Sequence, residues 1–203
     1  LLNNEPDPSL YANTVPAKLG EVHAFMSHSW SDDGRLKHEK VHEWARELGG
    51  DDDKLVWLDK ACIDQENIDA SLAALPIYRS GCQQLLMLVG PTYITRMWCV
   101  MEVFIFMRMK DGGTTDAAQH ASQLLVVKLL DDNTDLKLSL ACFDAAKAQC
   151  YYDRDRQKLL AVIEASFGTA TPFNQLVREV FDKQVLGLKE ASRSPVSRRI
   201  SGQ

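Results

Sequence analysis

Short apolar runs alternate with longer amphipathic segments along most of this chain, and this alternation constrains the fold more than any other feature. Runs of strand length lie at residues 22–27, 55–59, 85–89 and 124–130. Most of them are nearly continuous in apolar residues, which is typical of parallel strands that helices bury on both faces. The sequence therefore predicts an α/β fold of the flavodoxin-like, three-layer type, with a central parallel sheet of four to five strands.

Helix-length segments separate these runs and follow the last one, at residues 35–48, 69–79, 95–109, 153–167 and 171–187. Gly168, just beyond one of these segments, is a common helix terminator. Residues 136–150 fit either a helix or a short fifth strand. We expect an irregular lead-in over residues 1–20, one domain over 21–189 and a flexible basic tail over 190–203.

Composition limits the partners that this chain is expected to have. Its formal net charge of -5 provides no positive field for nucleic acid or for an anionic membrane surface. The sequence contains no apolar run of membrane-spanning length, so no direct membrane insertion is expected. Its five cysteines are odd in number and lack CxxC spacing, which favours reduced thiols and a cytoplasmic location for this stretch of chain.

Polar and aromatic residues follow the first three predicted strands. The first strand runs into Ser27-His28-Ser29-Trp30, the second into Asp59-Lys60-Ala61-Cys62, and the third into Gly90-Pro91-Thr92-Tyr93. In doubly wound sheets, ligands bind outside the carboxyl ends of the strands. We therefore expect the functional site where these loops meet.

Three segments resemble signatures of the Toll/interleukin-1 receptor (TIR) domain family. AFMSHSW (residues 24–30) resembles the first signature, and LVWLD (55–59) is similar to the second. LVGPTYITRMWCVMEV (88–103) is the most specific, with a strand, a tyrosine, then Trp-Cys and a glutamate three residues later. The match extends over residues 22 to about 130.

The chain also departs from the family pattern. His23 stands where many members have an acidic residue, and the loop after Asp59 lacks the glycine commonly found there. WLDKACIDQ (57–65) is similar to heterokaryon-incompatibility domains, which are related to TIR domains. The resemblance therefore indicates a divergent branch.

The resemblance implies a chemistry and a residue for it. Enzymatic family members cleave NAD+ between nicotinamide and ribose with a glutamate that corresponds to Glu102. One carboxylate suffices in principle, because nicotinamide leaves as a neutral molecule and the ribose acquires oxocarbenium character. NAD+ or a related nucleotide would be a substrate, with no cofactor. Activity would need self-association or other TIR-like domains, in signalling or defence.

The remaining candidates are assigned to substrate binding: Ser27, His28, Ser29, Trp30, Asp59, Lys60, Cys62 and Trp98. Trp30 would stack on a nicotinamide or adenine ring, or else cover the core. Asp59 would hold a ribose hydroxyl, pair with Lys60 or stabilise a turn. Trp98 also fits core packing, and Glu102 also fits a salt bridge to a neighbouring helix.

Two other interpretations compete with this one. His38-Glu39-Lys40-Val41-His42 matches the HExxH motif of zinc proteases, but charged residues surround it and no third ligand follows, so it is interpreted as a solvated helix face without metal. The chain could also be a non-catalytic signalling module that binds TIR-like domains through its surface, since fold alone does not determine function.

Overall fold

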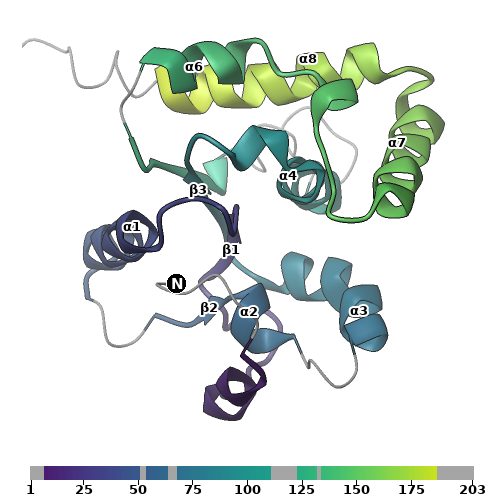
Figure 1. The fold of residues 1–203 in the computed structure, drawn as a ribbon. Coiled ribbons are helices and arrows are strands. Elements are labelled where there is room, and N and C mark those ends of the chain that lie inside the picture. The colour runs from purple at the N-terminus through teal and green to yellow at the C-terminus, as the bar shows by residue number, and fades with distance from the viewer. Residues whose placement is uncertain (1–6, 51–53, 64–67, 111–122, 132–133, 187–203) are drawn as a thin grey trace, which may run out of the picture.

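A computed structural model describes residues 7–50, 54–63, 68–110, 123–131 and 134–186 (Figure 1). Its centre is an all-parallel sheet with the strand order β2-β1-β3-β4. The strands are β1 (Ala24–His28), β2 (Val56–Trp57), β3 (Gln84–Val89) and β4 (Leu125–Leu129). The predicted three-layer α/β fold is confirmed, with four strands in the described part of the chain. The predicted tail, residues 190–203, lies outside the described residues.

The helices, in chain order, are α1 (Gly34–Glu47), α2 (Asp59–Cys62), α3 (Ile68–Gly81), α4 (Met97–Lys110), α6 (Thr134–Ala141), α7 (Asp153–Phe167) and α8 (Ala170–Phe181). Shorter turns are η1 (Pro8–Asn13), η2 (Tyr93–Thr95), η3 (Ala145–Lys147) and the π-helical η4 (Asp182–Leu186). No helix in the described ranges is long and apolar enough to cross a membrane.

Side chains alternate between the two faces of the sheet along each strand, and they form two separate cores. Phe25 and Met87 belong to the larger core, whereas Met26 and Leu88 belong to the smaller one. This follows because successive strand residues point to opposite faces of a sheet. In Figure 1, α1 covers the smaller core, and α4 lies between the sheet and the outer helices α6, α7 and α8. Helices therefore cover both faces.

The second strand and residues 136–150 require a revision of the expectations from the sequence. The second strand was predicted over residues 55–59 but includes only Val56–Trp57, because the chain turns into α2 at Asp59. The ambiguous residues 136–150 form most of α6, then η3, and finally an isolated bridge between Gln149 and Arg96. Within the described residues they add no fifth strand to the sheet.

Candidate functional site

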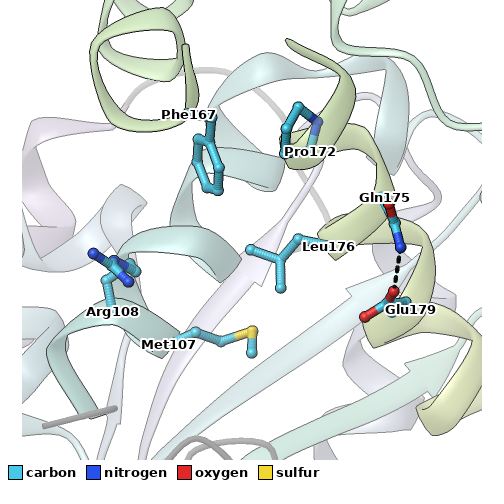
Figure 2. Close-up of a pocket in the computed structure, with 7 residues that line it drawn as sticks. All are labelled: Met107, Arg108, Phe167, Pro172, Gln175, Leu176 and Glu179. Atoms are coloured by element: carbon cyan, nitrogen blue, oxygen red, sulfur yellow. Dashed lines mark hydrogen bonds between the residues drawn. The ribbon is translucent and has the colours of Figure 1, made fainter. Parts of the chain in front are cut away.

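A hollow of about 370 Å³ lies between α4, α7 and α8 (Figure 2). Phe167, Pro172 and Leu176 provide much of its apolar lining. Its polar groups include Gln175, whose side-chain amide donates to Glu179 Oε1 at 2.9 Å. Because its walls come from helices and not from strand-end loops, this hollow is a weaker candidate for a functional site.

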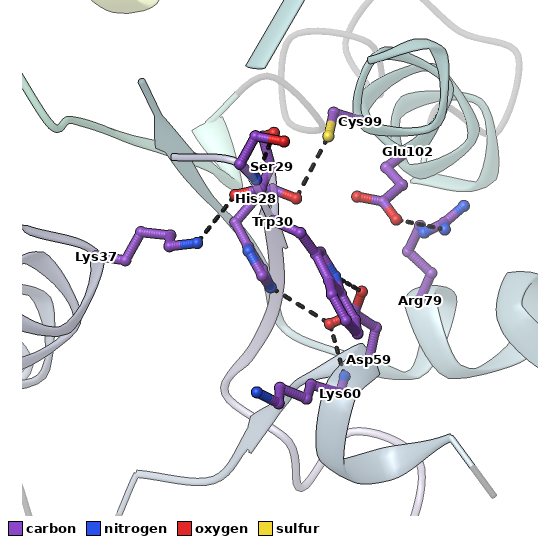
Figure 3. A network of polar contacts seen from close by, with 10 residues as sticks. His28, Ser29, Trp30, Lys37, Asp59, Lys60, Arg79, Cys99 and Glu102 are labelled. Atoms are coloured by element: carbon purple, nitrogen blue, oxygen red, sulfur yellow. Dashed lines mark hydrogen bonds and ion pairs between the residues drawn. The ribbon is translucent and has the colours of Figure 1, made fainter. Parts of the chain in front are cut away.

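A second crevice, of about 270 Å³, lies at the carboxyl ends of β1 and β2 (Figure 3). The sequence candidates that line it are His28, Ser29, Trp30, Asp59, Trp98 and Glu102. Their segments are far apart in the sequence, and the parallel sheet brings them to one edge. This crevice is the candidate functional site.

Glu102 lies in the second turn of α4 and reaches the crevice with a side chain that is 16% exposed. Its Oε1 atom lies 3.4 Å from Nη2 of Arg79 on α3. Burial raises the pKa of Glu102, while the charge of Arg79 and a hydrogen bond from Ser27 oppose that rise. The Glu102 side chain thus lines the crevice and is also paired with a buried cation.

Arg79 is almost completely enclosed, with 1% of its side chain exposed. Its guanidinium carbon lies 4.8 Å from the centroid of the Phe25 ring, and its Nε atom is buried without a hydrogen-bond partner among the described residues. A buried cation is costly unless an anion is close. Glu102 therefore has an evident structural role, whatever chemistry it performs.

Asp59 connects the loop after β1 to the start of α2. Its Oδ2 atom accepts a hydrogen bond from Trp30 Nε1 at 2.7 Å, and its Oδ1 atom lies 3.3 Å from His28 Nε2. The Lys60 amide also donates to Oδ1, at 2.6 Å. Burial raises the pKa of Asp59, but the hydrogen bond and charge interaction with His28, together with the hydrogen bonds from Trp30 and the Lys60 amide, outweigh burial, so its pKa is lowered. Both carboxylate oxygens already have protein partners.

These contacts fix Trp30 as one wall of the crevice (Figure 3). The Lys60 ammonium lies 6.0 Å from the centroid of the indole ring, at the outer limit of a cation–π contact. An indole held in this way loses little conformational freedom when a ring stacks on it. The arrangement suits an aromatic ligand.

Three of the residues assigned to substrate binding lie outside the crevice. Ser27 lies in the interior, with its hydroxyl 2.6 Å from that of Tyr93. Lys60 is 6% exposed and does not line the crevice, and Cys62 lines a separate groove beside the lead-in. Trp98, for which the sequence allowed either the site or the core, is 37% exposed and lines the crevice.

Charged residues that sequence reasoning missed also line the site or support it. Arg96 and Asp155 line the crevice, and Arg79 pairs with Glu102. Arg96 could have been singled out as a cation next to the Trp-Cys signature. The contact of Arg79 depends on how α3 and α4 pack, which local sequence patterns do not encode.

A buried polar cluster behind the crevice holds the loop after β1. Lys37, which is fully buried, donates from Nζ to the Ser29 carbonyl at 3.0 Å, and burial lowers its pKa. The Thr92 amide donates to Asp32 Oδ1 at 3.0 Å, which ties this loop to the loop after β3. These contacts fix the backbone that presents Trp30.

Comparisons of the chain with protein-family models, curated proteins and solved structures gave no match. The sequence motifs and the geometry of the crevice are therefore the features that bear on function.

Proposed function

We propose that this chain is a divergent TIR-type NAD+ nucleosidase, which cleaves the bond between nicotinamide and ribose with Glu102. The observation that supports it most directly is that the Glu102 side chain, 16% exposed, lines a crevice that Trp30 also lines. We further propose that the chain acts in the cytoplasm, in signalling or defence, after self-association. NAD+ is its substrate, and no additional cofactor is needed.

The proposed reaction uses the carboxylate form of Glu102. The glycosidic C–N bond breaks, and its electron pair goes to the nicotinamide nitrogen, which leaves without a proton. Glu102 faces the oxocarbenium character that develops at the ribose, and a carboxylate stabilises that charge most strongly where water is excluded. A water oxygen then bonds to the ribose carbon and releases one proton to solvent, which yields nicotinamide and ADP-ribose.

The size of the crevice bears on which part of the substrate enters. Ligand pockets commonly measure about 300–1,000 Å³, and this one, at about 270 Å³, lies just below that range. It suits the nicotinamide and its ribose, with the indole of Trp30 as a stacking surface. The adenosine half would then extend beyond the rim, where Trp98 is exposed.

Nicotinamide release from NAD+ by concentrated or artificially clustered protein tests the proposal. Glu102→Gln keeps the shape of the side chain and an acceptor for Arg79, so it is preferable to alanine. We expect release to fall by on the order of 100-fold or more, with the melting curve still cooperative. Glu164→Gln, at an exposed position on α7, is the matched control and should leave release unchanged.

A competing function would emerge from the same experiment. The Arg79–Glu102 ion pair fits a purely structural glutamate, as a non-catalytic TIR-type interaction module would have. If clustered native protein releases no nicotinamide, the interaction module becomes the better proposal. If Glu102→Gln releases as much nicotinamide as the native chain, an enzyme remains but its site is elsewhere.

A further inference from the structure

Helix α1 presents two histidines on its outer face, one helical turn apart. His38 and His42 are both exposed, and their Nε2 atoms lie 3.1 Å apart. The ring centroids are 4.4 Å apart, with 62° between the ring planes. Residues four apart on a helix share a face. The two nitrogens are therefore brought together by α1 itself.

This spacing suits two ligands of one metal ion. An imidazole nitrogen binds Zn²⁺ at about 2.0–2.1 Å. Two such bonds to nitrogens 3.1 Å apart enclose an angle of about 95–102° at the metal. That angle lies between about 90° for octahedral or square-planar ions and about 109° for tetrahedral ones. Only small adjustments of the rings would satisfy any of these geometries.

The neighbouring carboxylates on α1 are engaged by cations. Glu39 Oε1 lies 3.6 Å from Arg35 Nη1, and Glu43 contacts Lys40 at 2.7 Å and Lys128 at 3.1 Å. In the described ranges, no three His, Cys, Asp or Glu side chains form a group that could hold a metal ion. Two imidazoles are therefore the ligands that the described part of the chain offers here, and water would complete the shell.

We propose that His38 and His42 form an exchangeable binding site for a divalent transition metal, with Cu²⁺ bound more tightly than Ni²⁺ or Zn²⁺. The proposal departs from the interpretation of these residues from sequence alone, which was a solvated helix face without metal. The site also differs from a zinc-protease centre, because Glu39 pairs with Arg35 and the metal has no role at the crevice. Since both rings are exposed, the ion enters from solvent without disturbing the core. The proposal does not depend on NAD+ cleavage.

Titration of the metal-free chain with Cu²⁺ alone, by calorimetry and electron paramagnetic resonance, tests this site. We expect hyperfine coupling to two nitrogens. His38→Ala and His42→Ala should each weaken binding by on the order of 10-fold or more, because one imidazole lacks the advantage of a chelate. Glu39→Gln, one residue from His38 on the same helix, is the matched control and should bind as the native chain does.

The outcomes separate this site from other metal contacts. Equal Cu²⁺ affinity in the native chain and in the double variant His38→Ala/His42→Ala would overturn the proposal. Loss of binding in Glu39→Gln would also overturn it, because the site would then need a carboxylate ligand. The helical circular dichroism of each variant should match the native spectrum, since both histidines are exposed and alanine favours helix.

Discussion

The indole nitrogen of Trp30 donates a hydrogen bond to Asp59 across 2.7 Å, and this contact joins the ends of two neighbouring strands. Trp30 follows β1, and Asp59 begins α2 directly after β2. Because Asp59 also accepts from His28 and from the Lys60 amide, its role in the free protein is to position the crevice wall. A ligand would meet a wall that is already formed.

The coupling between Trp30 and Asp59 can be measured without any assay of function. Trp30→Phe keeps an aromatic ring but removes the donor, and Asp59→Ala removes the acceptor. Since hydrogen bonds to charged groups contribute about 1.5–3 kcal/mol, we expect a coupling energy of about 1 kcal/mol or more in a double-mutant cycle of urea unfolding. Strictly additive single effects would show that the contact contributes nothing to stability.

Removing one charge of the Arg79–Glu102 ion pair should destabilise the protein more than removing both charges. Glu102→Ala leaves the buried guanidinium without its anion, so the free energy of unfolding should fall by roughly 3–5 kcal/mol. Arg79→Met together with Glu102→Leu removes both charges and should recover most of that loss. Urea unfolding of the three proteins makes the comparison. A double variant no more stable than Glu102→Ala would contradict a compensating pair.

The raised pKa of Glu102 predicts a pH dependence with a definite sign. The stabilising contribution of the protonated carboxyl is complete when the pH is below 4.5, the ordinary pKa of the group. It is lost as the pH rises through the raised pKa of the folded state. The native chain should therefore lose stability relative to Glu102→Gln across that window, measured by urea midpoints at several pH values. Parallel curves for the two proteins would refute it.

Arg96 should distinguish substrates that carry phosphate from those that do not. The crevice is lined by the carboxyl groups of Asp59, Glu102 and Asp155, so a diphosphate needs a nearby cation. If NAD+ is the substrate, Arg96→Gln should raise its KM by roughly 10-fold and leave cleavage of nicotinamide riboside unchanged. Steady-state kinetics with both substrates test this, with Arg35→Gln on α1 as the control. Equal losses for the two substrates would argue for a general effect on the crevice.

Much of the fold could be predicted from the sequence, because a strand that is buried on both faces is a nearly continuous run of apolar residues. β3 and β4 lie almost where continuous apolar runs placed them, and α7 spans the predicted residues 153–167. The second strand was less predictable. Its apolar run continues through Leu58, but the chain changes from strand to helix at Asp59, whose carboxylate takes partners from another loop.

The site was predictable to the extent that topology alone determines it. Parallel strands end at one edge, so Trp30, Asp59 and Glu102 could be expected to meet, and all of them line the crevice. Side-chain direction could not be predicted. Cys62 lies only one helical turn from Asp59 but lines a different groove, because α2 turns it towards the lead-in.

Stretches distant in sequence build the crevice: the loop after β1, the start of α2, the first turns of α4 and the start of α7. They come together only in the folded chain, so a ligand of the crevice binds the native state and not the unfolded state. At a ligand concentration of 100 times Kd, such linkage adds about 2.7 kcal/mol to stability. A ligand of the crevice should therefore raise the melting temperature of the chain, and a panel of nucleotides can be ranked by the shift that each one causes.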